Sequence, residues 1–316
     1  MEVLVLGGSN FIGYHVVSEA VRRGHQVTTL SRGLTRTDLP PHVERLYCDR
    51  EDIDALKKTI GRRGFDAVFD TSAITVQLLH PSVNLLEGRV GHYIFTSTTA
   101  VYASSEELPI DEEFPLDYGT KIQYARDKLA CEELLREWGR KRDFPFTLLR
   151  SPMVFGPRNT HLERETQIMA RLRANVPIYI PGNGLCLLHH VYVEDLAVAH
   201  AISLDHKESI GEAYNIAGPT IVTLYGYVST IAKVLEIDPN FSFMPEALVG
   251  DMDRPWYFPF DWKRSSIYSI EKARFRLGYQ PRFPLADGMR KTYQWYLHEN
   301  LDEYPWDFRI SDRLPN

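Results

Sequence analysis

The sequence is poor in cysteine and contains no long hydrophobic run. Its 316 residues include three cysteines, Cys48, Cys131 and Cys186, whose odd number and spacing predict neither a disulfide framework nor a metal site. No stretch approaches the roughly 20 apolar residues of a membrane-spanning helix, so we expect no membrane partner. The chain starts with an apolar run rather than a basic region, which predicts no secretory signal and a cytoplasmic protein.

The sequence also lacks an excess of positive charge. Lys and Arg number 36 against 42 Asp and Glu, which gives a net charge of -6 at pH 7. Proteins that bind nucleic acids rely on basic surfaces, so we predict no nucleic-acid partner. Hydrophobic residues make up 44% of the chain and charged residues 25%, proportions that are typical of a globular protein.

Short apolar runs alternate with helical patterns through the first half of the chain. This alternation predicts a parallel sheet that is covered by helices on both faces. The expected strands are Val3–Leu6, Gln26–Leu30, Arg45–Cys48, Ala67–Phe69, Tyr93–Thr96 and Thr147–Leu149. In the second half we expect strands at Ile178–Ile180, Leu187–Val191 and Ala213–Ile216, and helices near 163–174, 194–204, 223–236 and 285–298. Parallel sheets bind ligands at the carboxyl ends of their strands, so we expect the chemistry there.

The first strand leads directly into a glycine turn that is followed by a helical pattern. Small residues at such a turn let the backbone close on a pyrophosphate at the positive end of a helix, which predicts a dinucleotide site. Asn10 replaces the usual middle glycine, and we expect it to adopt the left-handed backbone that Asn tolerates. A tight turn without a ligand is the alternative. The predicted cofactor contacts are Gly7, Ser9, Asn10, Phe11, Ile12 and Gly13.

Ser31 and Arg32 follow the second predicted strand, where an acidic residue would select NAD. No carboxylate repels a 2′-phosphate here and a guanidinium can pair with one, so the sequence slightly favours NADP over NAD. In the alternative reading, Arg32 stacks on adenine or points into solvent. After the third strand, Asp49 and Arg50 are candidates for contact with the adenine, and an ordinary helix cap is the alternative for Asp49.

Tyr124 and Lys128 are spaced i and i+4 on a predicted helix and therefore lie on one face. A neighbouring ammonium stabilises a phenolate and lowers the pKa of a tyrosine, which makes the phenol a usable acid or base. Upstream, the fifth strand ends in a run of hydroxyl side chains, 96–99, that could polarise a substrate oxygen. The spacing predicts Tyr124 and Lys128 as a catalytic pair.

Together these motifs resemble the extended short-chain dehydrogenase/reductase family, NAD(P)-dependent enzymes that include sugar-nucleotide epimerases, dehydratases and reductases. The resemblance covers nearly all of the chain. Further segments that resemble family signatures are Leu149–Pro157, Val191–Ala197, Tyr214–Gly218 and Ser269–Pro281. The resemblance implies a Rossmann-type doubly wound α/β fold. It places an NAD(P)-binding domain at residues 1–155, to which parts of 186–220 return, and a smaller substrate-binding α/β lobe mainly at 156–316.

The resemblance also implies roles for single residues. Thr98 aligns with the family's catalytic Ser/Thr, beside Tyr124 and Lys128. Further cofactor contacts are implied at Ser72, Ala73, Thr96, Tyr124, Lys128, Pro152 and Val154, and substrate contacts at Thr98, Thr99 and Arg254. No metal is expected, because His189 and His190 lack a third ligand at metal spacing. A homodimer is implied, since the helix that carries the tyrosine commonly pairs with its symmetry mate.

The sequence departs from the family pattern mainly around the substrate. Asp70-Thr71-Ser72-Ala73 replaces the usual His-x-Ala-Ala, and Pro152-Met153 replaces a Phe-Asn that touches a sugar diphosphate. Thr99-Ala100 occupies the place of the Asp-Glu pair of sugar 4,6-dehydratases, which argues against that elimination. The resemblance therefore implies an epimerase or a reductase acting on a hydroxyl or keto carbon of a small molecule, with nucleotide sugars as the leading class.

Two alternatives stay open. An NADP-dependent reductase of a non-nucleotide metabolite would account for the lost diphosphate contacts. A non-catalytic nucleotide- or RNA-binding protein is the other, because the altered glycine turn and Phe258-Pro259-Phe260 also resemble plastid RNA-binding relatives of the family. Those relatives tend to lose the Tyr/Lys pair that is intact here.

Overall fold

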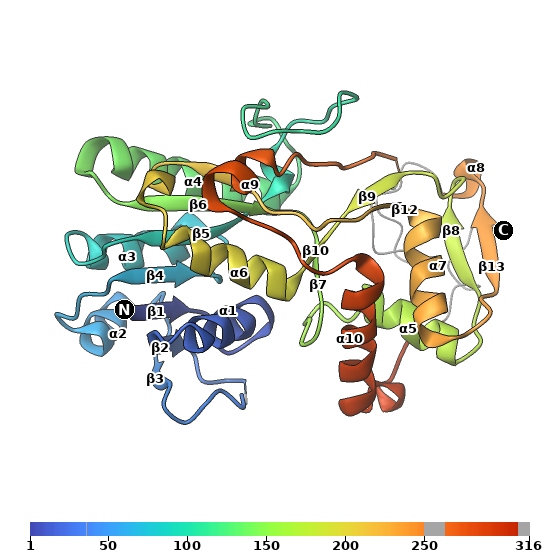
Figure 1. The fold of residues 1–316 in the computed structure, drawn as a ribbon, viewed down its shortest axis with the longest axis horizontal. Coiled ribbons are helices and arrows are strands. Elements are labelled where there is room, and N and C mark those ends of the chain that lie inside the picture. Colours follow the sequence, from blue (N-terminus) through green and yellow to red (C-terminus); the bar gives the residue numbers. More distant parts are fainter. Residues whose placement is uncertain (36, 250–262, 309–316) are drawn as a thin grey trace.

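The computed structural model describes residues 1–35, 37–249 and 263–308, and a seven-stranded parallel sheet forms its centre. The strands lie in the order β11-β6-β5-β4-β1-β2-β3, and every neighbouring pair is parallel (Figure 1). Their bounds are β1 Glu2–Leu6, β2 Gln26–Ser31, β3 Glu44–Tyr47, β4 Ala67–Asp70, β5 Tyr93–Thr98, β6 Phe146–Ser151 and β11 Ala213–Asn215. The order reverses between β1 and β4, where such sheets form a ligand crevice. The predicted Rossmann-type α/β fold is confirmed.

Helices cover both faces of this sheet because its strands are apolar on both sides. One face carries α1 (Phe11–Arg22) and α6 (Val193–Ser203). The other carries α2 (Ile53–Ile60), α3 (Val76–Leu86) and α4 (Gln123–Arg142). In β1, Val3 and Val5 belong to the hydrophobic core of the first face, whereas Leu4 and Leu6 belong to that of the second. Successive side chains of a strand point to opposite faces, so one short strand serves two cores.

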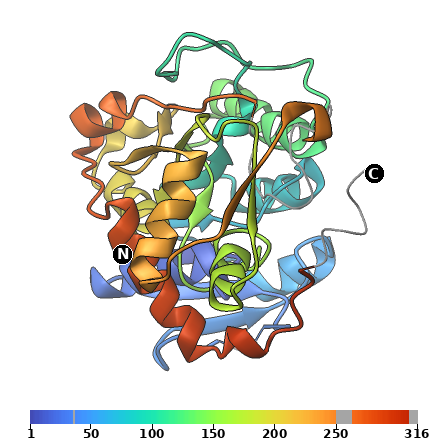
Figure 2. The same cartoon turned by 90° about the vertical axis from the view of Figure 1, so that its right-hand side faces the viewer.

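A second lobe lies beside the carboxyl ends of the strands (Figure 1). Its main helices are α5 (Glu165–Arg173), α7 (Leu224–Leu235) and α10 (Leu285–His298), and Figure 2 shows α7 in orange facing the viewer. Two strand pairs belong to this lobe. They are β8 (Ile178–Pro181) with β13 (Phe241–Met244), which is parallel, and β9 (Leu187–His189) with β12 (Ile221–Thr223), which is antiparallel. The short helix α8 (Glu246–Val249) also belongs to this lobe, whereas α9 (Glu271–Leu277) returns to the first lobe and packs on β11 and α6.

The run Leu187–Val191, predicted as one strand, forms parts of two strands. Its first residues form β9, which pairs with β12, whereas β10 (Val191–Tyr192) pairs with β7 (Val154–Phe155). The chain changes partners at His190, so an apolar run that looks continuous in the sequence serves two different sheets. Pairing partners are distant in sequence, and a local pattern does not reveal them.

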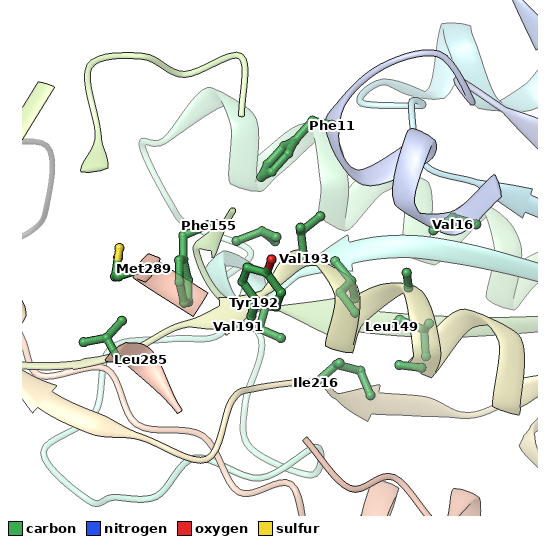
Figure 3. Close-up of a cluster of buried hydrophobic side chains, with 14 of the residues drawn as sticks. Phe11, Val16, Leu149, Phe155, Val191, Tyr192, Val193, Ile216, Leu285 and Met289 are labelled. Carbon is green, nitrogen blue, oxygen red and sulfur yellow. The ribbon is translucent and has the colours of Figure 1, made fainter. Parts of the chain in front are cut away.

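A single hydrophobic core joins the two lobes. Figure 3 shows its members around Phe155 and Tyr192, with Phe11 at the start of α1 and Met289 of α10 among them. Tyr192 is fully buried, and its ring centroid lies 5.5 Å from that of Phe155. Helix α6 and strand β11, both late in the chain, pack on α1 and β6 of the first lobe. The second lobe is therefore anchored by apolar burial.

Within the described residues, we find no helix that is both long enough and apolar enough to cross a membrane. The same part of the chain contains no group of three or more His, Cys, Asp or Glu side chains arranged to hold a metal ion.

Candidate active site

The glycine turn connects β1 to α1 with very close backbone contacts. A Cβ on Gly13 would lie 2.0 Å from the Gly7 carbonyl oxygen, so no side chain fits at this position. Gly7 has a φ of +88°, which favours glycine. The expectation that Asn10 takes a left-handed backbone is wrong. Asn10 is extended with φ at -135°, and Phe11 has the positive φ of 31° instead.

The amino end of α1 fits the pyrophosphate of a dinucleotide. The Asn10 side chain makes no capping hydrogen bond, and the first turn carries no acidic residue. Side-chain oxygens of Asp52, Thr75 and Thr223 cap α2, α3 and α7, whereas α4, α5, α6, α9 and α10 also lack such a cap, so the glycine turn rather than the missing cap distinguishes α1. The first amides of a helix need a partner. Helix α1 therefore offers uncapped amides at the end of a glycine cradle, where its dipole favours a bound phosphate.

Ser31 and Arg32 lie at the end of β2, on the side of the sheet predicted for the cofactor ribose. The Ser31 hydroxyl accepts a hydrogen bond from Gly33 N at 3.3 Å. Arg32 is exposed, so its guanidinium is accessible to a ligand. Beside them, the ring of Tyr47 would lie 2.9 Å from a Cβ on Gly33. A flat aromatic side chain thus borders this corner of the site.

Asp49 and Arg50 have very different surroundings, although they are adjacent. Asp49 is exposed and accepts the Glu51 amide at 3.0 Å, while the cap of α2 is Asp52. Arg50 is buried, and its guanidinium forms two hydrogen bonds with the Asp70 carboxylate at 2.8 and 2.7 Å. The predicted contact of Arg50 with the adenine therefore needs correction, because the side chain is occupied inside the protein.

Tyr124 and Thr98 meet at the carboxyl end of β5. Thr98 ends the strand and caps the 3-10 helix η1 (Thr99–Val101) by accepting Ala100 N at 3.1 Å. Tyr124 lies in the first turn of α4, and 44% of its surface remains exposed. Burial around its hydroxyl raises the pKa of Tyr124, whereas a hydrogen bond with Thr98 and the charge of Arg164 lower it. The two hydroxyls thus lie together at the edge of the sheet.

Lys128, one turn further along α4, points into the sheet. Its ammonium donates to the carbonyl oxygens of Ala73 at 2.8 Å and of Thr96 at 2.6 Å. It also lies 4.5 Å from the centre of the Phe95 ring. Burial lowers the pKa of Lys128 to about 8, and the charge of Asp70 opposes this shift. Lys128 therefore contacts the carbonyls of Thr96 and Ala73, two residues predicted as cofactor contacts, a placement that the i, i+4 spacing did not predict.

Lys128 is not among the groups that shift the pKa of Tyr124, contrary to the expectation from the sequence. The pKa of Tyr124 lies above its ordinary value because of burial, and the cation that opposes this rise is Arg164, which precedes α5 in the second lobe. Sequence analysis missed Arg164 because it is 40 residues away from Tyr124 and belongs to no motif. It also missed Asp70 as a partner of Arg50, although an acidic residue at the end of a buried strand is a recognisable signal.

The remaining predicted residues line the same edge or lie beyond the described part. Ser72 follows β4, and its hydroxyl accepts a hydrogen bond from Arg50 at 3.0 Å. Val154 starts β7, and Pro152 precedes it; both are buried. Thr99 is buried at the start of η1. Arg254 lies outside the described residues.

Chemically, the site combines the glycine turn, whose amides could hold a phosphate, with a phenol beside a hydroxyl. The glycine turn packs against the segment that follows β4, since a Cβ on Gly7 would lie 2.5 Å from Cβ of Ser72. Strand β4 lies next to β5, which carries Thr98. Lys128 bridges the two strands through Ala73 and Thr96. A proton donor and a dinucleotide cradle therefore share the carboxyl ends of three adjacent strands.

Comparison with known proteins gives the family. The model of the NAD dependent epimerase/dehydratase family matches residues 3–217. The chain is 29% identical to chloroplast stem-loop binding protein of 41 kDa b of Arabidopsis thaliana, over 99% of this chain and 84% of that protein. It is 26% identical to UDP-glucose 4-epimerase of Lactobacillus helveticus, over 95% of this chain and 98% of that protein.

Solved structures share the fold. UDP-glucose 4-epimerase from Bifidobacterium longum, in complex with NAD+ and UDP, matches with a TM-score of 0.78 at 19% identity. The match covers 96% of this chain and 100% of that chain. The family model spans well over half of the present sequence and includes the glycine turn, Thr98, Tyr124 and Lys128. The chain belongs to the NAD-dependent epimerase/dehydratase family, within the extended short-chain dehydrogenases/reductases.

Proposed function

We propose that this protein is an NAD(P)-dependent epimerase or reductase that acts on a hydroxyl or keto carbon of a nucleotide sugar. The observation that carries the proposal is the meeting of Tyr124 and Thr98 at the end of β5, next to Lys128 and the uncapped end of α1. Relatives named as sugar-nucleotide epimerases and dehydratases support the substrate class.

In the proposed mechanism, Tyr124 exchanges a proton with the reacting oxygen of the substrate. Thr98 orients that oxygen and donates a hydrogen bond to the developing charge. Lys128, held at the ends of β4 and β5, keeps a positive charge at this edge of the sheet, and Arg164 is the cation whose charge favours the phenolate of Tyr124. Burial lowers the pKa of Lys128 only to about 8, so the ammonium still carries its charge at neutral pH. When bound, the nicotinamide supplies the hydride chemistry.

We place the cofactor on residues that the fold brings to one crevice. The amides at the start of α1 would hold the pyrophosphate, and Ser31 and Arg32 would bind the ribose. An exposed guanidinium without a nearby carboxylate favours a 2′-phosphate, so we propose a modest preference for NADP. Epimerisation is favoured over dehydration, because Thr99 and Ala100 offer no acid or base for an elimination.

Replacing Tyr124 with Phe tests the proposal. We expect turnover of a responsive sugar nucleotide to fall by roughly 100-fold or more, since general acid-base catalysis contributes about that much. Cofactor affinity should stay within about twofold, because the phenyl ring keeps its packing. Turnover would be followed by NMR with UDP-glucose, UDP-glucuronic acid and dTDP-glucose as substrates. Tyr118→Phe is the matched control, since Tyr118 is exposed and its hydroxyl contacts Glu133. Unchanged turnover in Tyr124→Phe would contradict the assigned role.

Stem-loop RNA binding is a second candidate function, and one observation favours it. The chain matches a chloroplast stem-loop binding protein over 99% of its length. The net charge of -6 provides no general attraction for RNA. A filter-binding assay with a stem-loop RNA across a salt series separates the two functions. Salt-sensitive binding in the micromolar range, together with no sugar-nucleotide turnover, would favour the RNA-binding candidate.

A further inference from the structure

A buried ion pair lies directly beneath the predicted cofactor loop. Asp70 ends β4 and is fully buried, and Arg50 is only 7% exposed. The guanidinium binds the carboxylate with both terminal nitrogens, at 2.8 and 2.7 Å. The same two nitrogens also donate to the hydroxyls of Ser72 and Ser82, each at 3.0 Å, whereas Nε of Arg50 is buried without a hydrogen-bond partner. A two-pronged pair of this kind has little freedom to rotate.

The same carboxylate holds the backbone that follows β4. One oxygen of Asp70 accepts the amides of Ser72 at 3.1 Å and Ala73 at 3.0 Å. The other accepts the Tyr93 hydroxyl at 2.6 Å. Asp70 therefore receives hydrogen bonds from two backbone amides and two side chains. These contacts hold the backbone at Ser72 and Ala73 against the carboxylate.

The Ala73 carbonyl is one of two acceptors of the Lys128 ammonium. Lys128 Nζ lies 2.8 Å from Ala73 O and 2.6 Å from Thr96 O. Hydrogen bonds therefore connect Arg50 to Asp70, Asp70 to the amide of Ala73, and the carbonyl of Ala73 to Lys128. Among the described residues, no hydrogen bond joins Lys128 directly to Arg50 or to Asp70.

We propose that the Arg50–Asp70 pair is a positioning device for Lys128, in which Asp70 anchors the backbone at Ala73, the residue whose carbonyl accepts from Lys128, and provides the negative charge that faces the buried ammonium. The catalytic meaning of this device rests on the function proposed above, but the device itself is a property of the free protein. Arg50 and Asp70 act through Lys128, so they are positioning residues.

Electrostatics supports the geometric link. Burial lowers the pKa of Lys128 to about 8, and Asp70 is the strongest group that opposes this shift. Cys131 and Glu132 on α4 act in the same direction as Asp70, and Arg50 acts against it. For Asp70, burial would raise the pKa, but the charge and hydrogen bonds of Arg50 keep it below its ordinary value. The carboxylate therefore stays ionised throughout the pH range in which Lys128 titrates.

The test follows the titration of Lys128 by NMR in full-length protein labelled with 13C at the lysine ε carbon. Loss of one signal in Lys128→Met identifies the resonance. We expect a midpoint near 8 in the unsubstituted protein. In Asp70→Asn the midpoint should fall by about one pH unit or more, because a buried ammonium loses its main opposite charge.

Two further variants separate charge from structure. Tyr93→Phe removes a hydrogen bond from the same carboxylate but keeps its charge, so the midpoint should stay within about 0.3 pH unit. Arg50→Gln/Asp70→Asn leaves no unpaired charge and guards against misfolding of the single variant. In this double variant the midpoint should still fall, by less than in Asp70→Asn, because Asp70 outweighs Arg50.

The outcomes are decisive in each case. An unchanged midpoint in the folded double variant would overturn the proposal, as would a fall in Tyr93→Phe equal to that in Asp70→Asn. Conversely, the expected order of midpoints together with full activity of Tyr124→Phe would leave the device intact and refute the proposed function. Activity measured in the double variant then shows what the device contributes to turnover.

Discussion

Arg32 carries the proposed choice between the two nicotinamide cofactors. It is exposed at the end of β2, where its guanidinium can pair with a 2′-phosphate. We expect Arg32→Ala to weaken NADPH binding by about tenfold and to change NADH binding little, because one charge-assisted hydrogen bond contributes about 1.5 kcal/mol or more. Titrations of NADPH and NADH followed by fluorescence measure both constants. Arg62→Ala removes an exposed arginine after α2 and should change neither. Equal losses for both cofactors in Arg32→Ala would contradict the preference.

The pattern of single residues predicted the site only in part. The i, i+4 spacing of Tyr124 and Lys128 depends on helix geometry alone, so it could be read from the sequence. The backbone of the glycine turn could not, because Phe11 rather than Asn10 adopts the positive φ. Phe11 is buried in the core that joins the lobes, and packing of its ring offsets a conformation that the local sequence disfavours.

The turn between β1 and α1 depends on the absence of a side chain at Gly13. A Cβ there would lie 2.0 Å from the Gly7 carbonyl oxygen, so Gly13→Ala must move α1 away from β1. We expect this variant to lose about 1–3 kcal/mol of unfolding free energy and to bind cofactor at least tenfold more weakly. Urea denaturation and cofactor titration measure the two effects. Gly119→Ala is the control, since its Cβ would lie 3.6 Å from the nearest atom. Native-like cofactor affinity in Gly13→Ala would contradict the assigned phosphate cradle.

A buried ion pair attaches α4 to β6 and so holds the helix that carries Tyr124. Glu132 and Arg150 are almost completely buried, and their closest contact is 2.6 Å. Glu132 also accepts the Ser97 hydroxyl of β5 at 2.6 Å. We expect Glu132→Ala to cost about 3–5 kcal/mol of unfolding free energy, because Arg150 is left buried without its partner.

Chemical denaturation of Glu132→Ala measures this cost against a surface pair. Glu87 and Arg142 form an exposed ion pair at 2.9 Å, and Glu87→Ala should cost less than about 1 kcal/mol. A small loss in Glu132→Ala, comparable to that in Glu87→Ala, would show that α4 is held by apolar packing alone. The leucine and tryptophan side chains of α4, Leu135 and Trp138, belong to the core on this face.

Stability of the whole protein should decrease in mild acid because it buries neutral histidines. Burial lowers the pKa of His92 to about 4 from its ordinary 6.5, and that of His200 likewise to about 4. The unfolded chain therefore takes up protons first as the pH falls. The stability that each histidine contributes is complete above about pH 6.5 and is lost as the pH falls through 4. For His92 the total is roughly 3 kcal/mol.

His92→Gln isolates this effect, because a glutamine can keep the hydrogen bond with Thr147 Oγ1 but does not titrate. Between pH 6.5 and 4, the slope of unfolding free energy against pH should decrease by up to about 1.4 kcal/mol per pH unit. Urea denaturation at several pH values provides the measurement. His42→Gln replaces an exposed histidine and should leave the slope unchanged. An identical slope for His92→Gln and the unsubstituted protein would contradict a neutral buried His92.

Continuous apolar runs, helical spacing and the residues of the glycine turn were sufficient to predict the parallel sheet, the turn and the helix with Tyr124 and Lys128. These features depend on neighbours within a few residues, because a strand buried on both faces is a short apolar run and a helix repeats every 3.6 residues. Contacts that cross the fold leave no such local pattern. Arg50 meets Asp70, Arg164 influences Tyr124, and β9 and β10 choose different partners only once distant segments pack together. A buried charge must find an opposite charge in three dimensions, and the energy of that contact depends on distance and dielectric rather than on position along the chain.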